Sequence, residues 1–577
     1  MTLNQKSERL SRLLNAAQGR LDCDLVIEGA KYLDVFSCEW RKGDISILDG
    51  RIVALEPGLR AKRTIEGGAY SVVPGFVDAH VHLESSLLLP EYFQQLVLPK
   101  GTTTAICDPH ELANVMGLEG IRYFLDAAES LVLDLWVMLS SCVPATDMET
   151  NGRGVISASD LTSIARHPRA LGLAEMMNVP GVLSAAPEVV AKLGIFDRFM
   201  DGHSPLLRGR DLSTYVAAGI SSCHEASCLE EAREKIAKGM SIWIREGSVA
   251  KDLAALIALL NPATSSSIGF CTDDRNPLDI ATEGHLDHLL RMAIGHGIAP
   301  ELVYKSASWS PANHYGLNRG PDRIGAVAPG YRADLVLLSE PTTCAIAHVL
   351  KSGRLVSEMK FQSPSRSAGP VQALRAVVPE SRELDAVSAA QLEKPPGPVH
   401  VIGIEPGKII TQHLILPHDA PGVAKLSVLE RHGKKSKPAN GYVLGFGANF
   451  RGAIATSVGH DSHNLIVVGQ KCDDMRTALS ALIEVGGGFC VVQDGFVLTR
   501  LELPFGGLMS MLPSKELIPK LRELKQASQW VGCELPEPFL QLAFLSLPVI
   551  PHLKLTDRGL VDVDQFKIID ALGRPCG

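Results

Sequence analysis

The chain has 577 residues, of which 46% are hydrophobic and 21% charged, and it carries a net charge of −8. This length exceeds one ordinary core, so we expect about two to four domains. The mild acidity argues against nucleic acid or an anionic membrane surface as a partner. The 12 cysteines include no CxxC spacing, which is typical of reduced thiols in a cytoplasmic protein.

Residues 1–72 are predicted to form an N-terminal helix and the first part of a small β-sandwich. The chain begins with a polar segment that has no apolar leader, and it then changes to short strand patterns separated by glycine turns. The same strand pattern returns at residues 322–361. We therefore expect both flanks to complete one split sandwich around an inserted domain.

The inserted segment, residues 73–321, has a different pattern of apolar and polar residues. Eight apolar strand patterns recur about every 20 to 35 residues, and each is followed by a helical pattern. Eight such units over about 250 residues are typical of a TIM-like (β/α)8 barrel. The predicted fold class is therefore α/β, with this barrel as the catalytic domain.

Beyond the second flank, residues 362–398 are rich in Ser, Pro and Gly and are predicted to be a linker. Residues 399–577 mix strand and helix patterns, which predict a C-terminal α/β domain. Its most apolar stretch, residues 539–553, is interrupted by Gln541, Pro548 and Pro551. It falls short of the roughly 20 apolar residues that a membrane helix needs, so we expect no membrane partner.

Histidines and carboxylates stand at the ends of the predicted barrel strands. His80 and His82, in the segment GFVDAHVHLESS, are two residues apart on one strand and so point to the same face. Taken alone, such a pair is as often two hydrogen-bonded histidines. Barrel active sites lie at the carboxyl ends of the strands, however, and more residues of this kind fall there. The residues predicted to bind metal are His80, His82, Glu175, His203, His224 and Asp273.

This set resembles the amidohydrolase superfamily, whose members bind one or two divalent metals through a strand-one HxH pair, two later histidines and a strand-eight aspartate. Glu175 stands where many binuclear members carry a carboxylated lysine, and a glutamate can bridge two cations directly. Longer motifs, among them GTTTAICDPHELANVMG and GHDSHNLIVVG, are similar to those of the bacterial adenine deaminases over nearly the whole chain. Cys223 and Asn276 depart from that pattern, which leaves the fine substrate selectivity open.

The resemblance implies an adenine aminohydrolase. A metal-activated hydroxide is expected to attack C6 of adenine and to give hypoxanthine and ammonia, while Asp273 passes a proton to the departing amine. Two divalent ions are expected, with Mn²⁺ or Fe²⁺ favoured by the resemblance and Zn²⁺ compatible with the ligands. The expected partner is this small purine base, and we expect a homo-oligomer such as a dimer, because barrels of this kind often pair.

Further polar residues follow the predicted strand ends. Glu84, on the same strand face as the HxH pair, Glu111 and Glu225 are candidates for moving protons at the purine ring, or for orienting a metal ligand. Ser85 and Ser86 either bind substrate or cap the next helix. The GHDSHN turn of the C-terminal domain either closes the barrel mouth or is simply a polar turn. The residues predicted to contact substrate are Ser85, Ser86, His110, His460, Asp461 and His463.

Two alternative functions fit the sequence less well. A cyclic-amide hydrolase of the same superfamily is disfavoured by the missing strand-four lysine, and a non-catalytic barrel scaffold should lack the metal ligands. The zinc deaminase fold marked by HxE and PCxxC is excluded, because the sequence contains no PCxxC. Neither a GxxxxGK[ST] loop nor a Rossmann glycine motif indicates ATP or NAD.

Overall fold

The computed structural model describes residues 3–152, 154–364, 397–434 and 438–574. Almost all of the predicted linker at 362–398 lies outside these residues, so the linker and the domain boundaries drawn around it stay predictions. Within the described residues, no helix is both long and apolar enough to cross a membrane.

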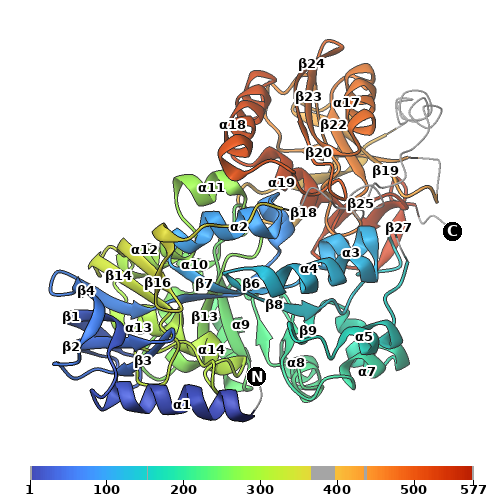
Figure 1. Cartoon of the computed structure of the whole chain (residues 1–577). Coiled ribbons are helices and arrows are strands. Elements are labelled where there is room, and N and C mark those ends of the chain that lie inside the picture. Colours follow the sequence, from blue (N-terminus) through green and yellow to red (C-terminus); the bar gives the residue numbers. More distant parts are fainter. Residues whose placement is uncertain (1–2, 153, 365–396, 435–437, 575–577) are drawn as a thin grey trace.

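Eight strands form the barrel in two hydrogen-bonded runs that meet on both sides (Figure 1). The amide of Ser221 donates to the carbonyl of Met200 (2.9 Å), which joins the first run to the second. On the other side, the amide of Asp273 donates to the carbonyl of His80 (3.1 Å). The predicted (β/α)8 barrel is confirmed. Its strands are β6 (Phe76–Val81), β7 (Thr102–Cys107), β8 (Asp134–Leu139), β9 (Ala170–Met176), β10 (Met200–Gly202), β11 (Ser222–Cys223), β12 (Ser241–Arg245) and β13 (Ile268–Cys271).

The barrel strands are buried along most of their length because helices cover their outer face. All residues of β6 and β7 are buried. Helix α4 shows the complementary pattern, since its buried residues Ile121, Phe124, Leu125 and Ala128 lie three or four positions apart on one face. The helices of this segment are α2 (Pro90–Val97), α3 (His110–Met116), α4 (Leu118–Ser130), α5 (Ala158–Ile164), α6 (Val179–Leu183), α7 (Pro187–Leu193), α8 (Gly209–Ala217), α9 (Leu229–Ala237), α10 (Leu253–Leu256), α11 (Pro277–Thr282), α12 (Leu286–Gly295), α13 (Pro300–Ser306) and α14 (Trp309–His314).

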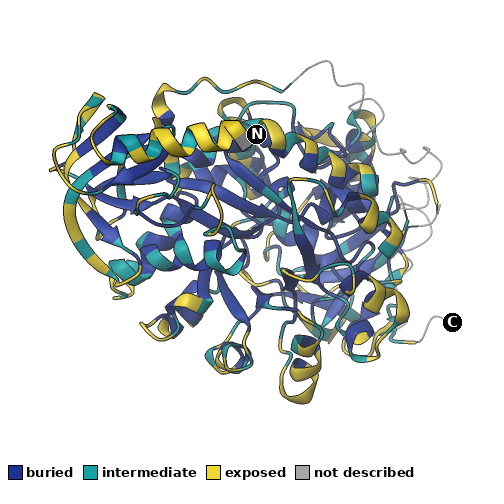
Figure 2. Ribbon diagram, turned by 60° about the horizontal axis from the view of Figure 1, so that its bottom comes forward, coloured by how far each residue is buried: buried dark blue, intermediate teal, exposed yellow. Residues whose placement is uncertain are grey.

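The segments before and after the barrel combine in one sheet of eight strands. Strand β5 pairs antiparallel with β14, so that Val73 lies opposite Val336 and Val72 opposite Leu337. Because β5 leads directly into barrel strand β6, this pairing fixes the sheet against the barrel. Helix α1 (Leu3–Ala17) lies on the outside with an exposed face (Figure 2). The strands are β1 (Cys23–Asp34), β2 (Glu39–Leu48), β3 (Arg51–Ala54), β4 (Ala61–Glu66), β5 (Ser71–Pro74), β14 (Leu335–Glu340), β15 (Ala345–Lys351) and β16 (Arg354–Leu355).

The C-terminal segment forms a further sheet of eight strands and a small sheet of three, and it packs on the barrel (Figure 1). The amide of Ser510 donates to the carbonyl of Leu87 (2.8 Å), and the rings of Tyr123 and Phe505 lie 4.6 Å apart across the same boundary. One apolar core therefore continues from the barrel into this domain. Its elements are β17 (Val399–Ile404), β18 (Thr411–Leu416), β19 (Val423–Leu429), β20 (Ala439–Leu444), β21 (Ala453–Thr456), β22 (Leu465–Gly469), α17 (Cys472–Val485), β23 (Gly488–Gln493), β24 (Phe496–Glu502), α18 (Ser514–Trp530), α19 (Pro538–Ala543), β25 (Leu553–Thr556), β26 (Gly559–Asp562) and β27 (Lys567–Ile569).

Candidate active site

The six predicted metal ligands lie together at the carboxyl end of the barrel. His80 lies in β6 and Glu175 in β9, and both are 2% exposed. The other four follow the last residue of their strands by one or two positions, where the chain leaves the barrel wall and side chains can turn toward its axis. These four are His82 after β6, His203 after β10, His224 after β11 and Asp273 after β13.

Four of these side chains direct one atom each to a common point. The Nε2 atoms of His80 and His82 lie 3.1 Å apart, and Glu175 Oε1 and Asp273 Oδ1 lie 3.2 to 3.7 Å from them. Ligands at about 2.1 Å from a tetrahedral metal are separated by about 3.4 Å. The observed separations therefore have the size of a metal coordination shell.

A second group forms around the other oxygen of the same glutamate. Glu175 Oε2 lies 2.7 Å from His203 Nδ1 and 3.2 Å from His224 Nε2. Glu225 Oε1 lies 3.8 Å from His203 Nδ1 and 3.5 Å from His224 Nε2. Because Glu175 offers one oxygen to each group, a single carboxylate links both.

The donor set fits divalent metal ions better than it fits protons. His82 Nδ1 lies 3.0 Å from the carbonyl oxygen of Asp108 and must donate to it, so the Nε2 atom of that ring carries a lone pair. Burial raises the pKa of Glu175, but His224 and His203 outweigh it and hold that pKa well below its usual range. Lone pairs thus converge on a buried, anionic centre that a cation would satisfy.

Arg245, the last residue of β12, completes the site and was missed in the sequence. Its guanidinium donates to both carboxylate oxygens of Glu225, to Asp273 Oδ2 (2.9 Å) and to Asp252 Oδ2 (3.0 Å). This contact fixes which oxygen of Asp273 faces the metal ligands. A charged residue that ends the buried strand SIWIR was the signal that could have revealed it.

A loop of the C-terminal domain reaches the barrel mouth. The loop joins β21 to β22, and His460 Nδ1 lies 2.5 Å from Glu111 Oε1, while His463 contacts the other oxygen of that carboxylate. His110 Nε2 lies 3.3 Å from Glu111 and 3.6 Å from Asp461. Burial raises the pKa of Glu111, but the three imidazoles hold it well below its usual value. The GHDSHN turn, whose role the sequence did not decide, therefore lines the same cavity as the predicted metal ligands.

These two parts enclose a cavity of about 320 Å³. The ring of His460 stacks on Phe544 with 4.6 Å between centroids, which gives the cavity a flat apolar wall. Its polar lining comes mainly from the barrel, and Ile409, Phe544 and Leu547 come from the C-terminal domain. The polar lining residues are His82, His110, Glu111, Glu175, His203, His224, Glu225, Arg245, Asp273, Asp274, His460 and Asp461.

Three residues predicted beside the HxH pair lie elsewhere. Strand β6 ends at Val81, and the chain then turns into a 3₁₀ helix, η1 (Leu83–Ser86), so the prediction that Glu84 shares the strand face was wrong. Glu84 instead accepts from the amide of Leu112 (3.0 Å), and burial raises its pKa to about 7. The hydroxyl of Ser86 donates to the carbonyl of Leu83 (2.6 Å). Glu84, Ser85, Ser86 and His463 do not line the cavity.

The barrel and its strand-end site define a hydrolase of the amidohydrolase class, and the model of the Amidohydrolase family matches residues 71–356. The model of the Adenine deaminase C-terminal domain matches residues 408–567. The chain is 48% identical over 575 residues to the adenine deaminase of Brucella suis biovar 1 (strain 1330), which covers 97% of this chain and 96% of the relative. It is 49% identical over 574 residues to the adenine deaminase of Methylobacterium sp. (strain 4-46), with 98% and 100% covered. The chain belongs to the adenine deaminase family.

Proposed function

We propose that this chain hydrolyses adenine to hypoxanthine and ammonia. The observation that carries the proposal is the convergence of buried histidines and carboxylates beneath a cavity that the family's own C-terminal domain closes. The relatives named as adenine deaminases share nearly half of their residues with it over almost the full length.

Two divalent ions are proposed for the two groups. His80, His82, Glu175 and Asp273 would hold one ion, and Glu175, His203 and His224 the other. A metal held by these residues would lower the pKa of a coordinated water to about 7 and so would supply a nucleophile at neutral pH. Mixed imidazole and carboxylate ligands suit Mn²⁺ or Fe²⁺, which we favour, and also Zn²⁺.

Asp273 is the proposed general base and acid. Arg245 holds its Oδ2 atom and so directs Oδ1 toward His80 and His82, where a second lone pair of Oδ1 can take a proton from the attacking water. As the water oxygen bonds to C6 of adenine and the bond from C6 to the amino nitrogen breaks, Asp273 gives that proton to the amine, which leaves as ammonia. Water and adenine are consumed, and hypoxanthine and ammonia are formed.

The cavity also offers groups for the purine itself. Phe544 and Leu547 give apolar surface for the ring faces, and His110, His460 and Asp461 provide hydrogen-bonding atoms for the ring edge. Glu111 lies among these three and can exchange a proton with a ring nitrogen through them. Glu225 is held by Arg245, so we propose that it orients the guanidinium and His224 rather than moving protons.

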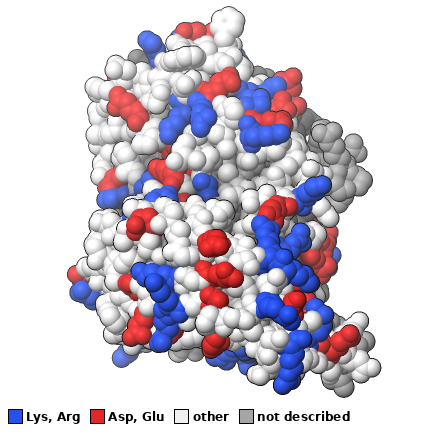
Figure 3. Space-filling model, turned by 60° about the vertical axis from the view of Figure 1, so that its left-hand side comes forward, with Lys and Arg blue, Asp and Glu red and all other residues white. Residues whose placement is uncertain are grey.

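We further propose that the partner is a small molecule rather than nucleic acid or a membrane. Figure 3 shows basic and acidic side chains interspersed over the face it draws, a surface that does not favour a polyanion. The described cysteines are free thiols, which supports a cytoplasmic protein. We propose a homo-oligomer, with a dimer as the simplest case, and light scattering on the purified protein will test it.

Ammonia release decides the function. Adenine, adenosine and a cyclic amide such as dihydrouracil are supplied separately to protein whose metal content is measured on the same sample. The proposal expects ammonia from adenine, with up to two divalent ions per chain. Rapid release from adenosine but not from adenine would reject the substrate, and hydrolysis of the cyclic amide alone would support the other branch of the amidohydrolases.

A further inference from the structure

The proposed adenine cavity is buried, so its substrate needs a path from solvent. Every residue that lines the cavity is at most 7% exposed. Two of its walls belong to different domains, the barrel strand ends and the loop before β22. A path along the seam between these domains requires the least rearrangement, because it crosses no strand of the barrel.

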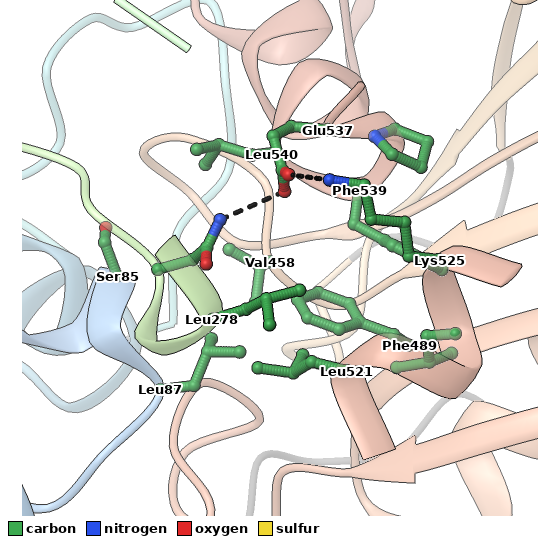
Figure 4. Close-up of a pocket in the computed structure, with 13 residues that line it drawn as sticks. Ser85, Leu87, Leu278, Val458, Phe489, Leu521, Lys525, Glu537, Phe539 and Leu540 are labelled. Carbon is green, nitrogen blue, oxygen red and sulfur yellow. Dashed lines mark hydrogen bonds and ion pairs between the residues drawn. The ribbon is translucent and has the colours of Figure 1, made fainter. Parts of the chain in front are cut away.

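A second pocket of about 620 Å³ lies in this seam (Figure 4). We call it the interdomain pocket. Its rim is open to water, since the side chains of Lys525 and Glu537 are 35% and 19% exposed. Its walls are mostly apolar and come from both domains, from Leu87, Leu278, Val458, Phe489, Leu521 and Leu540.

The interdomain pocket and the adenine cavity share walls. Ser85 lines the pocket, and its hydroxyl donates to Asp274 Oδ1, which lines the cavity. Ser85 is also the residue of η1 that is not fully buried. The loop before β22 separates the two spaces in the same way, with Val458 on the pocket side and His460 on the cavity side. The Ser85–Asp274 pair and the loop before β22 therefore separate the interdomain pocket from the adenine cavity.

The chemistry of the interdomain pocket suits a flat heterocyclic base. The rings of Phe489 and Phe539 lie 4.7 Å apart and nearly parallel, next to leucine side chains that can cover both faces of a planar ring. The pocket carries a carboxylate, Glu537, which accepts from Lys525 Nζ (2.8 Å) and from Asn276 Nδ2 (3.0 Å) (Figure 4). Each carboxylate oxygen has a further lone pair that can accept from an exocyclic amino group.

We infer that the interdomain pocket is the access route of the enzyme, in which a purine base docks before the Ser85–Asp274 pair opens to the catalytic cavity. The base lies between the apolar walls with its amino group toward Glu537. This inference rests on the proposed function for the identity of the base, whereas the route itself rests on the geometry of the seam.

The test uses substitutions that narrow the interdomain pocket and leave the residues lining the adenine cavity unchanged. Leu521→Trp on one wall and Leu278→Trp on the other fill the pocket, and Leu521→Met and Leu278→Met are the matched controls that keep its volume. Each is combined with Asp273→Asn, loaded with metal, so that adenine binds without turnover, and the association and dissociation rate constants are measured by stopped flow. Melting temperatures check that each variant is folded.

A blocked route has a kinetic signature that a damaged site lacks. Both rate constants should fall by the same factor, about tenfold, in the Trp variants while the dissociation constant stays unchanged, and the Met variants should match the parent. Unchanged rate constants in both Trp variants would overturn the inference. A weaker dissociation constant with an unchanged association rate would also overturn it, because it would assign these leucines to the cavity.

A second measurement separates the route from the substrate. The planar chelator 1,10-phenanthroline removes metal from the wild-type protein and from the Trp variants, and its rate should fall about tenfold in the variants. If the wild-type protein releases no ammonia from adenine, the proposed function fails, yet the chelator rates still decide the route. Equal chelator rates in all proteins would reject the route whatever the substrate.

Discussion

Two clusters of buried charged side chains lie at opposite ends of the same barrel. The strand-end cluster is the set of six metal-ligand candidates described above. The strand-start cluster lies at the amino ends of the strands, where Lys351 Nζ donates to the carbonyl of Thr103 (2.9 Å) and to two carboxylates at 2.7 and 2.8 Å. Arg332 pairs with the same two carboxylates. The members of the strand-start cluster are Asp134, Arg332, Asp334 and Lys351.

The clusters differ in how their charges balance. In the strand-start cluster two carboxylates face three permanent cations, because Arg169 also lies 3.7 Å from Asp134. The other oxygen of Asp334 accepts from the amide of Ser352 (2.8 Å). In the strand-end cluster the ion pairs of Glu175 within the described residues are all to imidazoles, which are neutral unless protonated. Buried charge is stable when paired, so the strand-start cluster joins the flanking sheet to the barrel, whereas the strand-end cluster has the ligand types of a divalent-metal site.

Replacement of one strand-end carboxylate should give the largest effect. Asp273→Asn keeps the shape of the side chain but removes its charge and its capacity to carry a proton. We expect kcat to fall about 10³-fold, or about 4 kcal/mol in the activation free energy, with KM nearly unchanged. Steady-state ammonia release and metal content are measured together. The neighbouring Asp274→Asn, which faces Ser85 and His460, is the control and should lose far less. A loss confined to KM would remove the proton-transfer role.

A substitution in the strand-start cluster should lower the stability of the protein and leave its turnover unchanged. Lys351→Met removes the ammonium that contacts both carboxylates and leaves Asp334 with Arg332 alone, so the free energy of unfolding should fall by about 3 kcal/mol. Turnover per folded molecule should be unchanged. Lys471→Met is the matched control, because its ion pair with Asp494 is exposed (62% and 61%) and should contribute less than about 1 kcal/mol. Equal destabilisation by the two substitutions would contradict the comparison.

Acid should reduce the stability that the strand-start cluster provides at pH values where Asp134 is still ionised in the folded protein. Burial raises the pKa of Asp134, but Lys351 and Arg332 outweigh it and lower this pKa from 3.8 to about 2. The unfolded chain therefore binds the proton first, so the stabilisation, about 2 kcal/mol, is complete above about pH 5 and is lost as the pH falls toward 2. Chemical denaturation of the wild type and of Asp134→Asn should give a difference that shrinks from pH 7 to pH 3. A constant difference would contradict the assigned pKa.

Some features of the two clusters could be predicted from the sequence, and others could not. The barrel and the position of the six candidate ligands at its strand ends were predictable, because strand period and strand-end position are local patterns. The strand-start cluster was not, since Asp134 and Lys351 are 217 residues apart and nothing local pairs them. Arg245 was missed for the same reason, because two of its partners, Glu225 and Asp273, follow other strands. Glu84 was misplaced because alternation does not reveal the residue at which a strand ends, and β6 ends at Val81.

The contact between the domains shows the same limit. The GHDSHN turn was recognised as polar and histidine-rich, but whether it meets the barrel depends on packing between domains that no local pattern encodes. Glu111 belongs to α3, and its partners His460 and His463 follow about 350 residues later, so the pairing appears only in the folded chain. Because His460 and His463 both contact Glu111, the effects of replacing each of them can be compared directly.

Substitution of these histidines should give the smallest effects and separate binding from support. Both contact Glu111, but only His460 lines the cavity, where its ring stacks on Phe544. His460→Asn should raise KM about tenfold, or about 1.4 kcal/mol, through lost contact with the purine, and should lower kcat less. His463→Asn should leave KM within about twofold and lower the melting temperature instead, because it leaves a buried carboxylate oxygen with one partner fewer. Equal KM values for the two variants would mean that the loop only supports the barrel mouth and does not contact the substrate.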